Sequence, residues 1–72
     1  MKRIKIKRQQ CKLTQSQLSH LSGVNIKTLQ AYEQGEIDIN QASALTVAKL
    51  AEVLNCDVLD LLERKTSDIL DE

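Results

Sequence analysis

A chain of 72 residues forms one domain at most, because it buries only about 60% of the surface that it exposes when unfolded. Its composition favours packed helices over sheets, since 42% of the residues are apolar, proline is absent, and glycine and aromatic residues are scarce. The formal net charge of zero argues weakly against a nucleic-acid partner until the charges are located. Residues 1–32 contain seven basic residues and no acid, whereas residues 33–72 contain ten acids and three basic residues. The amino-terminal half can therefore present a basic face to phosphates, and an ordinary solvated face is the alternative.

Cysteine and histidine are too few for a disulfide scaffold or a zinc site. We therefore expect Cys11 and Cys56 to be buried or half-buried hydrophobic residues, and His20 to lie on the surface. The sequence has no signal peptide and no apolar run near the roughly 18 residues of a membrane span, which predicts a cytoplasmic protein with no membrane partner. It also indicates no cofactor and no enzyme, since no nucleophile, base or phosphate-binding glycine loop is in place.

The first predicted helix covers about residues 2–11. Ile4, Cys11 and, less regularly, Ile6 recur there among basic residues at helical spacing. The apolar stripe of this helix is thin.

A second helix is predicted to start after Thr14, whose hydroxyl can cap the amide of Gln17 while the Gln17 side chain reaches back in a capping box. Leu18 and Leu21 are its apolar residues. It ends at Gly23, which can adopt the left-handed conformation that terminates helices.

A third helix, Ile26 to Gln34, follows after only Val24 and Asn25, with Asn25 as its N-cap and Gly35 at its end. Leu29 and Tyr32 lie three positions apart and are predicted to face inward. The residues left on the other faces are Lys27, Thr28, Gln30, Ala31 and Gln34.

Residues 36–42 are predicted to form a loop with Ile37 and Ile39 as inward anchors. The most hydrophobic helix then begins between Asn40 and Ser43 and ends at Asn55 in a left-handed conformation. Its apolar positions are Leu45, Ala48, Leu50, Ala51 and Leu54. We expect Leu18, Leu29, Leu50 and Leu54 to meet in one cluster.

A fifth helix is predicted after Asp57, which caps it, and its apolar residues Val58, Leu61 and Leu62 turn it onto the core. The domain then covers residues 1–64. The polar tail, residues 65–72, either frays or extends the last helix into a contact with a second copy through Ile69 and Leu70.

The segments Thr14 to Ser19 (TQSQLS), Gly23 to Asn25 (GVN) and Leu29 to Gly35 (LQAYEQG) closely resemble the signature of the lambda-repressor-like family, the Cro and Xre type of helix-turn-helix. Residues 50–55 (LAEVLN) and 58–62 (VLDLL) resemble the two closing helices of that family. The resemblance covers about residues 4–63. It implies an all-α domain of five helices, with the helix-turn-helix as helices two and three and the third helix reading DNA.

Roles follow from the resemblance position by position. It implies that Gln15 and Gln34 bind phosphates and that Arg8 pairs with Glu33. The residues implied to lie at base edges are Ile26, Lys27, Thr28 and Ala31, with Gln30 nearby. The alternatives are capping or solvation for the two glutamines, and ordinary helix surface for Lys27 and Thr28.

Several residues depart from the family pattern. Ser19 and Ser22 stand where alanine and a larger apolar residue are usual, and Leu21 is apolar where polar residues are common. Ile26 stands where an amide is usual, so it would contact a thymine methyl group or simply pack.

The main hypothesis is a small transcriptional regulator, repressor-like, that binds operator DNA as a homodimer, because one such domain buries too little surface for high specificity. The alternative is a protein-interaction or antitoxin-like module that keeps the fold with little DNA reading. Its protein partner would bind the acidic carboxy-terminal half and the tail.

Overall fold

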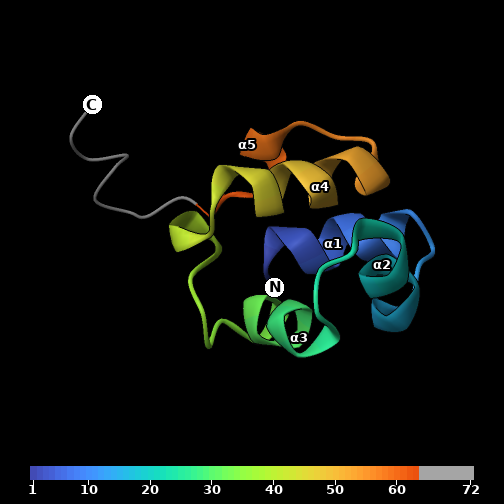
Figure 1. Ribbon diagram of the computed structural model, residues 1–72, viewed down its shortest axis with the longest axis horizontal. Helices are drawn as coiled ribbons and strands as arrows, with labels where there is room; N and C mark the ends of the chain where they lie inside the picture. Colours follow the sequence, from blue (N-terminus) through green and yellow to red (C-terminus); the bar gives the residue numbers. More distant parts are fainter. Residues whose placement is uncertain (64–72) are drawn as a thin grey trace.

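The computed structural model describes residues 1–63 and, within them, contains α-helices, one 3-10 helix and no strand. The elements, in chain order, are α1 (Arg3–Gln10), α2 (Gln15–Ser22), α3 (Ile26–Gln34), η1 (Ile39–Gln41), α4 (Ala44–Leu54) and α5 (Val58–Leu61) (Figure 1). The predicted all-α class, with the helix-turn-helix formed by the second and third helices, is confirmed. The predicted boundary at residue 64 and the tail with Ile69 and Leu70 lie outside the described residues.

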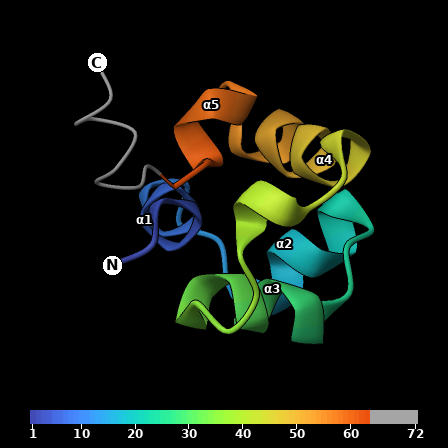
Figure 2. The ribbon, with the colours of Figure 1, turned by 90° about the vertical axis from the view of Figure 1, so that its left-hand side faces the viewer.

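The helices pack at different angles around a common core and do not form parallel layers. Figures 1 and 2 show α3 at the lower edge of the molecule and α4 and α5 above it, with α1 and α2 between these two levels. The second helix packs against both α3 and α4, while α5 packs against α4 and α1. This arrangement leaves one side of α3 open to solvent.

The core is one hydrophobic cluster, aliphatic except for Tyr32, to which every α-helix contributes. Its fully buried large side chains are Ile4, Leu18, Leu29, Leu50 and Leu61. Burying one such side chain contributes roughly 1.5–3 kcal/mol. The predicted meeting of Leu18, Leu29, Leu50 and Leu54 is confirmed.

Side-chain caps begin three of the helices as predicted. Before α2, the Gln17 amide donates to Thr14 Oγ1 (3.0 Å) and the Thr14 amide donates to Gln17 Oε1 (2.8 Å), completing the capping box. The Lys27 amide donates to Asn25 Oδ1 at 2.8 Å before α3. Ser43 caps α4 in the same way. Each such cap contributes about 1 kcal/mol.

Three predicted helix ends are also confirmed, and all three have the left-handed conformation that was predicted for Gly23 and Asn55. Gly23 after α2 has φ 76°, Gly35 after α3 has φ 80°, and Asn55 after α4 has φ 54°. No side chain hinders this conformation at glycine, and asparagine tolerates it better than most residues. These positions therefore end their helices where the residue type indicates.

A fourth left-handed end, at Lys12, was not predicted. Lys12 has φ 60°, and the amides of Leu13 and Lys12 donate to the carbonyls of Arg8 (3.2 Å) and Gln9 (3.0 Å). This pair of bonds is the Schellman arrangement, which glycine usually permits. Lysine does not favour the left-handed conformation, so the residue type at position 12 did not indicate this helix end.

The inward face of α4 differs from the prediction. Val47, Leu50, Ala51 and Leu54 are buried, whereas Leu45 is 65% exposed and Ala48 is also exposed. The buried set follows the i, i+3, i+4, i+7 spacing of one helical face when it is counted from Val47. The prediction counted from Leu45 and was wrong at those two positions.

Other apolar positions lie outside the core as well. Leu21 is 59% exposed because Leu18 and Ser22, one turn apart, occupy the inward line of α2. Ile37 is 47% exposed, so of the two predicted anchors only Ile39, at the start of η1, is buried. Ile6 lies at the solvent edge of α1.

The two cysteines differ. Cys11 follows the last residue of α1 and is exposed, which contradicts the predicted burial, and its thiol donates to the Leu54 carbonyl at 3.4 Å. Cys56 is half-buried as predicted, and burial raises the pKa of its thiol. His20 is exposed as predicted.

Asn40 and Glu63 connect the loop after α3 to the end of α5. The Asn40 side chain donates to the Glu63 carbonyl at 2.6 Å and accepts from the Glu63 amide at 2.9 Å. The Glu63 carboxylate also accepts from the Arg3 amide at 2.6 Å, at the positive end of α1. Asn40 therefore connects two distant segments, whereas the sequence offered it only as a helix cap.

Candidate nucleic-acid interface

The turn between α2 and α3 is held by two serine hydroxyls. Ser19 Oγ donates to the Val24 carbonyl at 2.6 Å. Ser22 Oγ is buried, donates to the Leu18 carbonyl at 2.6 Å and accepts from the Val24 amide at 3.2 Å. The two serines that depart from the family pattern thus have hydrogen-bond partners, and they fix the turn that sets the direction of α3.

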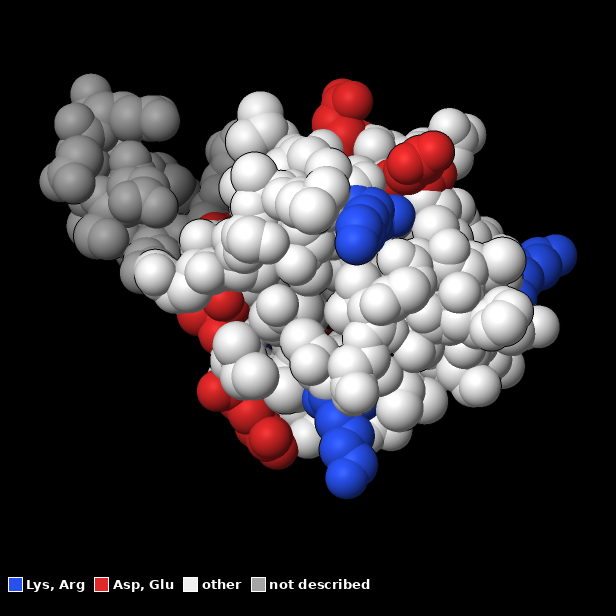
Figure 3. All heavy atoms as spheres, viewed as in Figure 1, with Lys and Arg blue, Asp and Glu red and all other residues white. Residues whose placement is uncertain are grey.

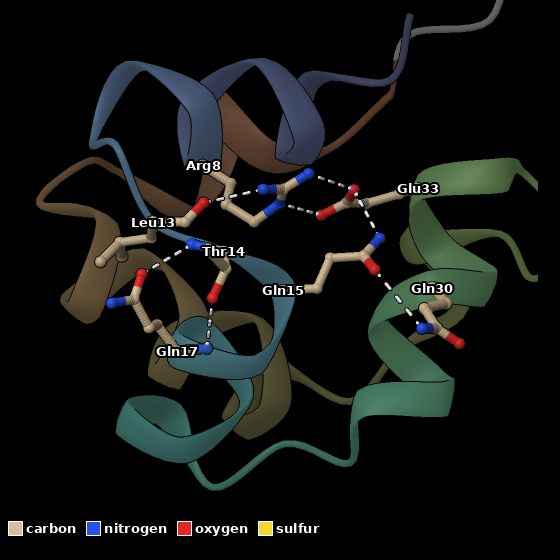
Figure 4. A network of polar contacts seen from close by, with 7 residues as sticks. All are labelled: Arg8, Leu13, Thr14, Gln15, Gln17, Gln30 and Glu33. Atoms are coloured by element: carbon tan, nitrogen blue, oxygen red, sulfur yellow. Dashed lines mark hydrogen bonds and ion pairs between the residues drawn. The ribbon is translucent and has the colours of Figure 1, made fainter.

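Arg8 and Glu33 form a two-pronged ion pair between α1 and the end of α3 (Figure 4). Arg8 Nε donates to Glu33 Oε2 at 2.7 Å and Nη2 donates to Oε1 at 3.0 Å, while Nη1 donates to the Leu13 carbonyl at 2.7 Å. The side chains are only 12% and 2% exposed. The hydrogen bond to Glu33 raises the pKa of Arg8. The predicted pair is confirmed, and its burial makes it far more consequential than an exposed pair.

The same carboxylate extends the network to α2. Gln15 Nε2 donates to Glu33 Oε1 at 3.1 Å, and Gln30 Nε2 donates to Gln15 Oε1 at 3.4 Å (Figure 4). The first three helices are therefore joined through one carboxylate. This use of Gln15 and Gln30 was not predicted, because nothing in their spacing along the chain shows that they meet.

The outer side of α3 carries most of the predicted base-edge residues. Lys27 and Gln34 are exposed, and Ile26, Thr28 and Gln30 are half-buried. Ala31 is 8% exposed, so its predicted place on an outer face was wrong. The reason is that α3 packs against both α1 and α2, which makes its buried arc wider than the line through Leu29 and Tyr32.

The charges around α3 are basic on the open side. Figure 3 shows basic side chains projecting at the edge where α3 lies, and acidic ones near the loop after α3 and around α5. Within residues 1–63, no salt bridge neutralises Lys27. An exposed cation on an unobstructed helix suits a polyanion.

Two other kinds of site are absent from residues 1–63. No helix formed by residues 1–63 combines the length and the apolar character needed to cross a membrane. That part of the chain also holds no group of three or more His, Cys, Asp and Glu side chains arranged to bind a metal ion.

A family model described as helix-turn-helix matches residues 4–61, from the first turn of α1 to the end of α5. Neither the curated proteins nor the solved structures gave a match.

Proposed function

Because this chain belongs to the helix-turn-helix family of the Cro and C1 type, whose members are DNA-binding regulators of transcription, we propose that it binds one operator sequence as a homodimer and represses from it. Family membership indicates regulation through DNA rather than catalysis. The observation that most supports sequence reading is the network around Glu33, which fixes α3 while its outer side remains open.

In this proposal, α3 enters the major groove, which is about 12 Å wide and admits one helix. Lys27 donates to guanine acceptors, Thr28 and Gln30 contact neighbouring base edges, and Ile26 packs against a thymine methyl group. Ala31 is left out of this set because so little of it is exposed.

Gln15 and Gln34 are assigned to phosphates. Gln34 is exposed at the end of α3. Gln15 has two amide hydrogens, of which one is accounted for by Glu33, so the other can donate to a phosphate oxygen. Contacts of this kind position the protein on the duplex and carry no sequence information.

A single module of this size buries roughly 600–1,000 Å² of protein surface on DNA, whereas specific interfaces bury about 1,000–2,500 Å². The homodimer is proposed because a second copy doubles the buried surface. Two copies related by a two-fold axis would read two half-sites about one helical turn, or roughly 34 Å, apart. The amino-terminal Lys and Arg residues supply the salt-dependent part of the affinity.

Selection of binding sites from random duplexes tests the proposal. We expect an enriched palindromic sequence, and we expect Lys27→Ala and Thr28→Ala to lower affinity for it more than for random DNA, by about 1–3 kcal/mol per lost base contact. The matched control is Lys12→Ala, which removes one exposed charge away from α3. It is expected to lower the affinity for the selected operator and for random DNA by a similar factor.

Two results would contradict sequence reading by α3. One is selection without an enriched sequence. The other is unchanged operator preference in both α3 variants, in which case a protein partner, as for an antitoxin-like module, becomes the better account of this fold.

A further inference from the structure

Large aliphatic side chains project into solvent from the side of the molecule formed by α2 and α4. Leu21 on α2 and Leu45 on α4 are more than half exposed. Leu21 lines a groove between the two helices. We call this surface the α2–α4 face, and its residues are Leu21, Leu45, Ala48, Lys49, Glu52 and Val53.

The charges of the α2–α4 face come from Lys49 and Glu52 alone among its six residues. Figure 3 shows the side of the molecule over α4 and α2 as largely uncharged, with few basic or acidic groups. Exposed apolar residues that gather on one surface, rather than lying singly, commonly mark a contact with another protein. The aliphatic residues alone do not specify which protein.

Two opposite charges within this face indicate which protein binds there. Lys49 and Glu52 are both exposed, both line the groove with Leu21, and stand three residues apart on the same side of α4. No salt bridge within residues 1–63 involves either of them. Within residues 1–63, the face therefore carries one positive and one negative charge that no salt bridge pairs.

This arrangement is complementary to itself. If α4 packs antiparallel against α4 of a second copy, with the two-fold axis between positions 49 and 52, Lys49 of each copy faces Glu52 of the other. The pair then forms twice, as a two-fold interface requires. An interface with an unrelated protein would not need opposite charges in this mirrored register.

We propose that the α2–α4 face binds a second copy of this chain, with α4 packed antiparallel against its copy and Leu21 and Leu45 buried between them. The inference rests on the homodimer of the proposed function and assigns its surface. Lys49 and Glu52 set the register, because like charges placed opposite each other disfavour the wrong pairing more strongly than exposed ion pairs favour the right one.

The same two-fold axis suits DNA reading. In Figure 1, α3 lies at the lower edge of the molecule and α4 lies in its upper half, below α5, while Figure 2 shows α2 and α4 on one side of the molecule. A two-fold axis that lies in the α2–α4 face, crosses α4 at right angles and runs toward the edge with α3 would leave both α3 helices at the same end of the dimer. The residues assigned to DNA are absent from the α2–α4 face, so both surfaces can be occupied together.

Charge reversal in the full chain tests the register by sedimentation equilibrium. The wild type is expected to sediment at about twice the chain mass of 8.1 kDa. Lys49→Glu alone and Glu52→Lys alone are each expected to raise the dimer Kd at least tenfold, about 1.4 kcal/mol, because each dimer would then place like charges opposite each other twice. An equimolar mixture of the two variants is expected to regain the dimer, since every facing pair is again opposite in sign.

Lys12→Glu and Glu36→Lys are the matched controls, because they reverse exposed charges outside the α2–α4 face and are expected to leave the dimer unchanged. Circular dichroism confirms that each variant is folded. A wild-type dimer that both reversals leave intact would overturn the assigned surface while leaving the homodimer of the proposed function standing. A wild type that stays monomeric in solution and on selected DNA would overturn both, and sequence reading by α3 would still be judged by the binding-site selection.

Discussion

Helices α3 and α4 are of similar length but are held in different ways. Helix α3 is anchored at its carboxyl end by directional bonds, since the Glu33 carboxylate accepts from Arg8 and Gln15. Helix α4 is anchored by Val47, Leu50 and Leu54, which pack against other aliphatic side chains. Aliphatic packing tolerates small rotations and shifts, whereas a two-pronged ion pair fixes distance and angle. Helix α3, which is assigned to reading DNA, therefore has directional bonds that fix its orientation in addition to the core packing of Leu29 and Tyr32.

The largest expected effect comes from removing the carboxylate that anchors α3. Glu33→Ala is expected to cost about 3 kcal/mol or more, because it leaves the largely buried Arg8 guanidinium with only the Leu13 carbonyl and leaves Gln15 without its acceptor. Urea denaturation followed by circular dichroism measures the loss.

Glu33→Gln is the matched control. It keeps one acceptor oxygen in nearly the same place, so a smaller loss of stability is expected. A loss below about 1 kcal/mol for Glu33→Ala would mean that the network does not anchor α3.

The next effect concerns the packing of α4. Leu50→Ala is expected to cost about 2–5 kcal/mol because Leu50 is fully buried. Leu45→Ala, five residues earlier on the exposed side, is expected to change the free energy of unfolding by less than about 0.5 kcal/mol. Both variants are measured at a dilution that keeps the chain monomeric, so that dimer formation does not contribute to the free energy of unfolding. Equal losses at the two positions would contradict the inward face that starts at Val47.

The smallest effect is expected at the turn between α2 and α3. A Cβ atom at Gly23 would meet no atom within 4 Å apart from its chain neighbours, so the expected cost of Gly23→Val is attributed to its φ of 76°. We expect more than about 1 kcal/mol, because β-branched residues are strained in the left-handed region. Gly23→Asn should cost less, since asparagine tolerates that region. Equal melting temperatures for wild type and Gly23→Val would contradict the described turn.

The sequence predicted the elements that depend on local chemistry. Thr14, Asn25 and Ser43 cap helices, and Gly23 and Asn55 end them, because each of these residues acts on backbone groups within a few positions of itself. Such residues can be interpreted from the sequence without knowledge of the fold. The left-handed Lys12 escaped because its residue type does not favour that conformation.

Contacts between distant segments were harder to predict. The Arg8–Glu33 pair was expected only through the family resemblance, and the bond between Gln15 and Glu33 was not expected at all. The exposure of Leu45 and the burial of Ala31 depend on which neighbours cover each helix, and that information lies in the tertiary arrangement. Periodicity located these helices correctly but left the width of their buried faces open.

The central claim is that α3 is the surface that reads DNA, and amide chemical-shift mapping tests it most directly. The full chain, labelled with ¹⁵N, would be titrated with a duplex carrying the selected operator. The account predicts that the largest shifts fall on residues 26–30 of α3 and on Gln15 at the start of α2, with small shifts in α5. Shifts that centre on α5 while residues 26–30 stay unchanged would contradict it.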